Sequence, residues 1–355
     1  MSTTGLRVAV VGASLGGLSA ANVLRRLGVQ VEVFEAFPHG FHRRGGALGA
    51  VDTSLLSRIR GSDAGPVRPI RGHGHFYGDL WAYLYEALPP DSVHFGVDID
   101  QVERADTDSP ALYAHEKLRS FDLVIGADGG ASSVRRYVTA QTPSYAGYTV
   151  WRGLVPTDGI DGPPSGRRTV AGIAYETLGF PCAGPDGGAM WNCGVYMATP
   201  ESEVAVPTRN RQVGKPLKRV PDWFVPFTAA LFGARNGRFW KACARLGKVS
   251  PHAVWELASD RVVNRRIALL GDAAHMASPR TGAGAYTAMV DAVVLGEALV
   301  RSSSVDHALA LYNTDTVHRG RQLFARSRGA ADAFAPEGRT VRSPEQVLRE
   351  LTAQS

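Results

Sequence analysis

Residues 8–36 read VAVVGASLGGLSAANVLRRLGVQVEVFEA, and this stretch decides the fold. An apolar run, a glycine-rich turn, a helical stretch and a second apolar run follow in the order of a βαβ dinucleotide-binding unit. Near-continuous apolar character is typical of a parallel strand that is buried on both faces. We therefore expect a strand that ends at Gly12, a helix from about Leu15 to Leu27 that Gly28 stops, and a second strand over residues 29–36, VQVEVFEA.

The glycine-rich turn departs from the usual G-x-G-x-x-G pattern, because Ser14 stands at its middle position. Gly12 allows the tight turn, and Gly17 allows the helix to pack closely on the sheet. Ser14 has a small side chain, and its hydroxyl is able to donate to a phosphate. The first helical turn, with Leu15 and Gly16, presents backbone N–H groups and the positive dipole end to an anion.

Glu35 indicates which dinucleotide fits this unit. It lies 23 residues after Gly12, near the offset of about 20 residues at which a carboxylate accepts from a ribose 2′-hydroxyl. A carboxylate disfavours a 2′-phosphate, so NAD or FAD is favoured over NADP. The unit by itself fits NAD and FAD equally well. The alternative is a tight turn with a purely structural role that binds no ligand.

Two later stretches repeat the pattern of a buried strand that ends in a carboxylate. Residues 121–136, FDLVIGADGGASSVRR, place Asp128 at a strand end, and residues 265–299, RRIALLGDAAHMASPRTGAGAYTAMVDAVVLGEAL, place Asp272 there. Pro279, Gly282 and Gly284 then introduce a helix. Ligands of open α/β sheets bind at the carboxyl ends of the strands, so we expect the three stretches to form one site.

With these three motifs, the sequence resembles the class A flavoprotein monooxygenases, the single-component aromatic hydroxylases of the para-hydroxybenzoate hydroxylase type. The resemblance extends from Arg7 to about Gly329. YAGYTVWRGLVP at 145–156, PDW at 221–223 and VWEL at 254–257 are similar to the branch that includes 2,6-dihydroxypyridine 3-hydroxylase. The resemblance to the family implies an α/β fold: a Rossmann-like FAD-binding domain of the glutathione reductase type with an interleaved antiparallel-sheet substrate domain.

The resemblance also answers which dinucleotide is bound, because it implies FAD, with NADH or NADPH as a transient second cofactor. The ADP half of FAD would lie at the first motif, Asp128 would serve both cofactors, and Asp272 would accept from a ribitol hydroxyl. The flavin ring would lie against the start of the last helix. The residues expected to bind cofactor are Gly12, Ser14, Leu15, Gly16, Gly17, Glu35, Arg43, Arg44, Asp128, Asp272, Pro279, Gly282, Ala283 and Gly284.

Two residues depart from the family pattern. Tyr286 stands where many relatives have an asparagine beside the flavin, and Tyr77 stands where many have the arginine of an R-x-x-L segment. Ser14, in contrast, is shared with the dihydroxypyridine hydroxylase branch. These departures concern the flavin's contacts rather than its presence.

The resemblance implies that NADH or NADPH reduces the flavin, that O₂ forms a hydroperoxide at flavin C4a, and that one oxygen enters an electron-rich aromatic or heteroaromatic substrate. Gly282 and Gly284 would contribute to catalysis, because the helix N-terminus that they open stabilises the anionic reduced flavin. The base that activates the substrate is not fixed by the sequence. Its candidates are His42, His73, His75, Tyr175 and Tyr196, whereas His275 is expected to be structural.

Other functions on the same fold stay open at this point. They include an epoxidase, a Baeyer–Villiger-type enzyme, an oxidase, a cyclase of secondary metabolism and a non-catalytic flavin-fold binder. The intact D-G and G-D motifs argue against the binder. The six tryptophans form no W-x-W-x-I-P, which disfavours a flavin halogenase.

Strand-like stretches between the second and third motifs indicate an inserted domain. Five aromatic residues in them, Trp151, Tyr175, Phe180, Trp191 and Tyr196, are expected either to line an aromatic pocket or to be ordinary core. We predict an FAD-binding domain at 1–75, 95–150 and 255–330 and a substrate-binding domain at 76–94 and 151–254. Residues 331–355 would form a C-terminal tail with a short helix that begins in a capping box.

Composition excludes several classes of protein. The 355 residues carry a net charge of +6 with scattered basic residues, which favours a solvated basic surface over a nucleic-acid site. The three cysteines form no C-x-x-C, and we predict no metal site. The first strand begins too early for a signal peptide, and no apolar run spans a bilayer. We expect a cytoplasmic protein that acts on a small molecule and O₂; a homodimer is left open.

Overall fold

The computed structural model describes residues 5–41, 47–49, 51–62, 65, 74–184, 188–204, 216–336 and 340–353. The chain divides into two compact units. Unit 1 comprises Met1–Arg44, Leu48–Pro143 and Glu256–Arg326, and unit 2 comprises Gly45–Ala47, Ser144–Trp255 and Ser327–Ser355. No helix among the described residues is long and apolar enough to cross a membrane.

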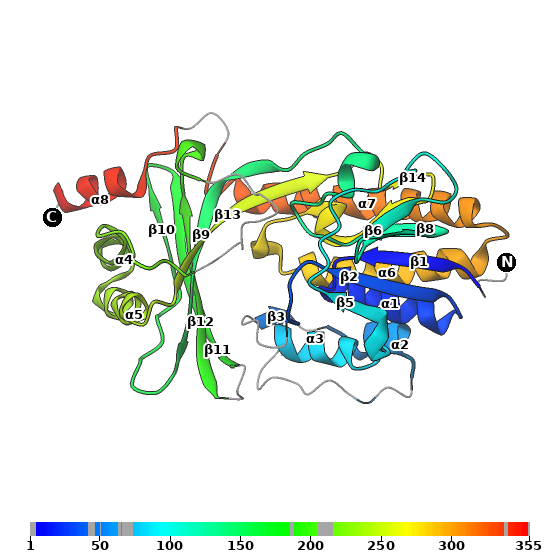
Figure 1. The fold of residues 1–355 in the computed structure, drawn as a ribbon. Coiled ribbons are helices and arrows are strands. Elements are labelled where there is room, and N and C mark those ends of the chain that lie inside the picture. The colour runs from blue at the N-terminus through cyan, green and yellow to red at the C-terminus, as the bar shows by residue number, and fades with distance from the viewer. Residues whose placement is uncertain are drawn as a thin grey trace. The chain divides into compact units, whose positions relative to one another are not determined.

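Unit 1 is built on a six-stranded sheet whose central strands are parallel (Figure 1). The order is β14-β15-β8-β1-β2-β5, and only β14 runs antiparallel to its neighbour. Apolar residues fill these strands because both faces of the sheet are covered. The strands are β1 (Arg7–Val11), β2 (Gln30–Glu35), β5 (Val93–Phe95), β8 (Leu123–Gly126), β14 (Val263–Asn264) and β15 (Ile267–Leu269).

Two helices of unit 1, α1 (Leu15–Arg26) and α6 (Gly284–Arg301), pack closely on each other. A Cβ at Gly296 of α6 would lie 2.3 Å from Cγ1 of Val23 of α1, so the contact requires a glycine there. The other helices are α2 (Thr53–Arg60), α3 (Tyr77–Tyr85) and α7 (Val305–Ala331), which continues into unit 2. Short elements are β3 (Ala47–Gly49), β4 (Gly74–Phe76), β6 (Ala111–Ala114), β7 (Lys117–Ser120), β16 (His275–Met276), and the 3₁₀ turns η1 (Pro90–Ser92), η2 (Arg135–Tyr137), η4 (Gly271–Ala273) and η5 (Pro279–Thr281).

Unit 2 is an antiparallel sheet in the order β10-β11-β12-β9-β13, and Figure 1 shows α4 and α5 on one side of it. The last strand, β13, continues into unit 1, where its final residues pair with β16. The elements are β9 (Ser144–Pro156), β10 (Gly166–Val170), β11 (Ile173–Ala183), β12 (Ala189–Ala198), β13 (Val249–Ala258), η3 (Glu201–Glu203), α4 (Phe224–Phe232), α5 (Ala234–Arg245) and α8 (Pro344–Ala353).

The two compact units differ from the predicted domains in two segments, and the main segment of unit 2 begins at Ser144 rather than at residue 151. Residues 76–94 belong to unit 1 rather than to the inserted domain, because α3 packs on α1: Nε1 of Trp81 donates to the carbonyl oxygen of Ala13 (2.7 Å), and Nδ2 of Asn22 donates to that of Leu84 (2.8 Å). Apolar spacing alone does not show which sheet a helix will cover.

Residues 331–355, in turn, are part of unit 2 and not a separate tail. Phe334 stacks on Tyr148 of β9 with ring centroids 4.9 Å apart, and α8 packs on α4 through the buried Val347. The predicted capping box of α8 is present, since the Ser343 amide donates to Oε1 of Gln346 and the Gln346 amide donates to Oγ of Ser343.

Candidate functional site

The three strand-end motifs of unit 1 meet at one edge of the parallel sheet. Val11 of β1 is in register with Phe34 of β2 and with Gly126 of β8, and Gly126 is in register with Leu269 of β15. The residues that follow these strands therefore leave the sheet side by side. This is the edge at which ligands of open α/β sheets bind.

The glycine-rich turn requires its glycines for two separate reasons. Gly12 has φ +105°, and a Cβ on it would lie 2.4 Å from the carbonyl oxygen of Ala127. A Cβ on Gly17 would lie 1.9 Å from the carbonyl oxygen of Gly12. The turn is therefore packed tightly under α1. Among the described residues no side chain caps the α1 N-terminus. Its first N–H groups are therefore available to an anion, as a binding site for a pyrophosphate requires.

Glu35 also braces the glycine-rich turn, a role that no sequence pattern indicated. Its side chain is buried, with Oε2 accepting from the Ala13 amide (2.8 Å) and Oε1 from the Phe37 amide (2.9 Å). The carboxylate thereby holds the glycine-rich turn onto the end of β2. Each carboxylate oxygen accepts more than one hydrogen bond, so the predicted contact with a ribose hydroxyl remains compatible with this bracing.

Ser14, which departs from the usual G-x-G-x-x-G pattern, contacts Tyr77, which departs from the family pattern. Oγ of Ser14 and Oη of Tyr77 are 2.7 Å apart and share a hydrogen bond. Ser14 precedes α1 and Tyr77 begins α3, so the bond joins the N-terminal ends of two helices. Two neutral hydroxyls therefore meet where the usual dinucleotide-binding pattern has a glycine and where the resemblance led us to expect an arginine.

Asp128 organises the turn that follows β8. Its Oδ1 accepts from Oγ of Ser132 (2.5 Å), and its Oδ2 accepts from the amides of Ser133 (2.7 Å) and Val134 (3.3 Å). Oγ of Ser132 in turn accepts from the Arg135 amide (3.0 Å). Asp128 thus shapes the loop; its predicted contact with the cofactors stays a prediction.

Arg135, which had no predicted role, links the second motif to the third. Its Nε donates to the carbonyl oxygen of Ala273 (2.8 Å), and its terminal nitrogens donate to those of Asp272 (3.0 Å) and Gly130 (2.8 Å). The guanidinium is buried, and desolvation lowers its pKa against the raising effect of Asp128 and Asp272. The only sequence signal was a basic residue directly after the D-G turn.

Asp272 is presented at the sheet edge by a turn whose other residues are buried. The Asp272 residue is exposed, whereas Gly271 and Ala273 on either side are buried. Its backbone carbonyl is fixed by Arg135, as above. The arrangement fits a carboxylate that accepts from a ligand hydroxyl.

The segment before α6 has features that fit a ring lying against the backbone. Gly282 has φ +62°, in the left-handed region, so the turn itself requires a glycine. Gly284 does not have a positive φ, and a Cβ on it would meet nothing within 4 Å among the described residues. Because the fold does not require a glycine at 284, the space there suits a ligand. No side chain caps α6 within the described part of the chain, and Ala283 is its N-cap.

These observations fit FAD. Two helix N-termini that no described side chain caps suit the pyrophosphate and the anionic flavin. Three carboxylates, those of Glu35, Asp128 and Asp272, end or follow strands at the sheet edge, and the backbone at Gly284 is open among the described residues. Pro279 opens the turn η5 with Ser278 as its cap. Tyr286 is exposed in the first turn of α6. His42, Arg43, Arg44 and His73 lie outside the described residues, as does the side chain of His75.

The five aromatic residues of the inserted domain do not line one pocket. Cross-strand register places Tyr175 opposite Arg168, and Glu176 opposite Tyr196, so the two tyrosines occupy opposite faces of the unit 2 sheet. Tyr175 is fully buried beneath α4, with its ring 5.6 Å from that of Phe227. The other face carries Tyr196 and Phe180, whereas the helix-covered face carries Trp151, Tyr175 and Trp191.

Tyr175 is poorly placed to act as a base. Burial raises its pKa to about 12, with Glu350 adding to the rise and Arg342 opposing it. Its hydroxyl has no hydrogen-bond partner among the described residues. Tyr196 is also mostly buried, beside Phe334, on the face that α4 and α5 do not cover.

Comparisons with known proteins bear on the cofactor and on the class of reaction. The FAD binding domain family matches residues 240–327. A 3-amino-4-hydroxybenzoate 2-monooxygenase from Streptomyces cremeus is 27% identical, over 97% of this chain and 92% of that protein. The comparisons confirm the resemblance to the class A FAD-dependent aromatic hydroxylases.

Solved structures show the same fold. The 2,6-dihydroxypyridine-3-hydroxylase from Arthrobacter nicotinovorans superposes with a TM-score of 0.74 at 23% identity and covers 95% of both chains. Klebsiella pneumoniae HpxO, solved with FAD and uric acid, gives 0.73 at 24% identity, with 98% and 93% covered. The predicted α/β fold, the FAD cofactor and the monooxygenase class are confirmed.

Proposed function

We propose that the protein uses FAD, NADH or NADPH, and O₂ to hydroxylate a small, electron-rich aromatic or heteroaromatic compound. The observation that carries this proposal is the convergence of the three strand-end motifs on one sheet edge. The similar proteins named above act on an aminohydroxybenzoate and a dihydroxypyridine, and one was solved with uric acid. These compounds share an electron-rich ring with acidic groups.

We assign each part of FAD to a different group of residues. The turn from Gly12 to Gly17 and the α1 N-terminus would hold the pyrophosphate, and Glu35 the adenosine ribose. Asp272 would accept from the ribitol, and the backbone from Gly282 to Gly284 would lie against the ring. When bound, FAD supplies the electron transfer from the nicotinamide and the activation of O₂. The protein contributes placement, and a positive helix end where negative charge develops.

We further propose that the substrate contacts the face of the unit 2 sheet that α4 and α5 leave uncovered. Polar residues gather on it: Arg152 of β9 donates to Oδ1 of Asn192 (3.5 Å), and Glu176 of β11 is in register with Tyr196 of β12. The opposite face is an apolar core beneath the helices. A guanidinium on the substrate face would favour a substrate that carries a carboxylate or an ionised hydroxyl.

The test is a panel of phenols, hydroxypyridines and hydroxybenzoates added to the purified, FAD-loaded chain. We expect particular aromatic compounds to accelerate flavin bleaching by NADH or NADPH, and ¹⁸O from ¹⁸O₂ to enter the product. Arg152→Gln should raise KM for carboxylated compounds, whereas Arg168→Gln, at an exposed position of β10, should not. Flavin reduction that no aromatic compound accelerates, with no hydroxylated product, would overturn the hydroxylase proposal.

A further inference from the structure

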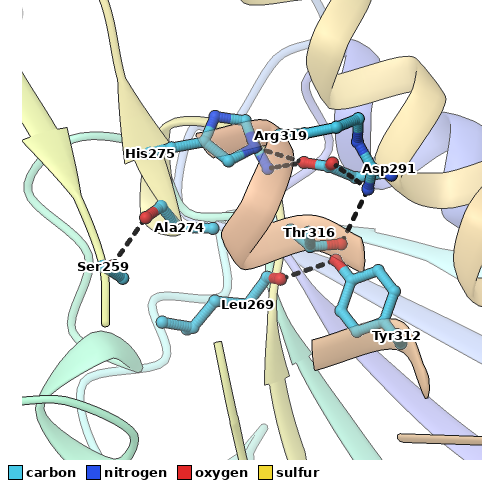
Figure 2. A network of polar contacts seen from close by, with 9 residues as sticks. Ser259, Leu269, Ala274, His275, Asp291, Tyr312, Thr316 and Arg319 are labelled. Atoms are coloured by element: carbon cyan, nitrogen blue, oxygen red, sulfur yellow. Dashed lines mark hydrogen bonds and ion pairs between the residues drawn. The ribbon is translucent and has the colours of Figure 1, made fainter. Parts of the chain in front are cut away.

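A buried carboxylate in α6, Asp291, is the centre of a network that no motif predicted. It is fully inaccessible to solvent. Its Oδ2 accepts from the Gly271 amide (3.0 Å) and lies 2.7 Å from Nε2 of His275, and its Oδ1 accepts from a terminal nitrogen of Arg319 (3.0 Å). Figure 2 shows His275 and Arg319 converging on it. A buried carboxylate is tolerated only with such partners.

The contact with Gly271 ties this network to the candidate cofactor site. Gly271 has φ +59° and immediately precedes Asp272. Its amide is held by Asp291, while the carbonyl oxygens of the next two residues are held by Arg135. The turn that presents Asp272 is therefore fixed from two sides by charged groups. Neither of them needs to touch a ligand to do so.

The same network fixes the turn against α7. Arg319 also donates to Oγ1 of Thr316 (2.8 Å), and Oη of Tyr312 donates to the carbonyl oxygen of Leu269 at the end of β15 (2.7 Å) (Figure 2). A Cβ on Gly320 would lie 3.3 Å from that of His275, so α7 also lies close to the other side of the imidazole. The chain from Leu269 to His275 thus follows the surface of one helix.

We propose that Asp291 is a positioning residue for the cofactor: through Gly271 it sets the direction in which Asp272 points. This proposal rests on the FAD site described above and goes beyond it, because Asp291 is sealed from any ligand. Its effect should therefore fall on the part of the cofactor that Asp272 would contact, the ribitol, and not on the adenosine half. A merely structural residue would not make that distinction.

The test compares FAD with ADP on the full-length apoprotein. Asp291→Asn keeps the side-chain volume and removes the charge, so we expect at least 10-fold weaker FAD binding, measured by flavin fluorescence quenching. ADP, which lacks the ribitol, should compete for the site with an affinity within twofold of wild type. Asp306→Asn is the matched control, because it also removes a carboxylate paired with an arginine (Arg266) in unit 1, but at an exposed position away from the turn. Its FAD affinity should stay within twofold.

A second variant covers the case in which Asp291→Asn does not fold. Arg319→Gln removes one of the three donors from a partly exposed side chain, and we expect about threefold weaker FAD binding with unchanged ADP competition. Normal FAD affinity in a folded Asp291→Asn, or equal losses for FAD and ADP, would overturn the positioning role. Normal FAD affinity in Arg319→Gln would do the same if only that variant folds. Failure of the wild type to bind FAD would instead overturn the cofactor site itself.

Discussion

Gly284→Ala should separate the stability of the apoprotein from its affinity for FAD. Gly284 begins α6 without a positive φ, and an added Cβ would meet nothing within 4 Å among the described residues. The methyl group therefore costs the apoprotein no steric strain. In the FAD complex, the same methyl group would occupy the space that we assign to the flavin ring. The two effects should have opposite signs.

The position of Gly284 sets the size of the change in apoprotein stability and of the change in FAD affinity. Replacing glycine by alanine at a compatible backbone position stabilises a protein by about 0.4–1 kcal/mol, chiefly by lowering the entropy of the unfolded chain. For a chain of this length, that corresponds to a rise in apoprotein Tm of roughly 1–3 °C. Forcing an extra methyl group into a close contact costs about 1–3 kcal/mol. FAD binding should therefore weaken roughly 5- to 150-fold.

The assay is differential scanning fluorimetry of the apoprotein together with a fluorescence titration of FAD. Gly329→Ala is the matched control, because Gly329 is also a helical glycine with open space around its Cβ and belongs to unit 2. It should raise Tm by a similar amount and leave FAD affinity unchanged. Gly284→Val should weaken FAD binding further and slow reduction of the bound flavin by the nicotinamide.

If Gly284→Ala bound FAD as tightly as wild type while its Tm rose, the flavin ring would not lie beside Gly284. That outcome would show that Gly284 is only a helix-start glycine. A fall in apoprotein Tm would show instead that the space beside Gly284 is not open.

Three further outcomes are expected. Asp272→Ala should weaken FAD binding about 10- to 150-fold, since a hydrogen bond to a charged acceptor is worth roughly 1.5–3 kcal/mol; normal flavin retention with normal circular dichroism would remove Asp272 from the site. Tyr175→Phe should leave kcat and its pH profile unchanged, because that hydroxyl is buried beneath α4, whereas Tyr196→Phe should change kcat or KM; the reverse pattern would place the substrate on the helix-covered face. Burial alone would lower the pKa of His275, but the charge of Asp291 and the hydrogen bond to it outweigh burial and raise the pKa above its usual value. The stabilisation is therefore complete below about pH 6.5 and is lost as pH rises through the raised pKa. The difference in unfolding free energy between wild type and His275→Asn, from urea denaturation, should shrink over that range, and a difference that stays constant with pH would show that His275 does not titrate against Asp291.

The sequence by itself determined the parts of this protein that depend on local spacing. The strand, turn and helix of residues 8–36, the two later strand-end carboxylates and the apolar side of α6 follow from residue periodicity and from glycines at tight turns. These features were enough to predict the fold class and a dinucleotide site, and the family resemblance that they carry implied FAD. They act within a few residues, so a linear pattern records them.

Only the tertiary structure decided which groups hold that site in shape. Arg135 reaches Asp272 across 137 positions of the chain, and Glu35 binds the Ala13 amide across 22. Asp291 gave one signal, an acidic residue within the apolar side of α6, but its partners come from a turn and a second helix. Likewise, alternation along β11 and β12 separates the faces of Tyr175 and Tyr196, yet only the docking of α4 and α5 decides which face becomes core. Hydrogen-bond partners and covered faces arise when distant segments pack together, and no local pattern specifies that packing.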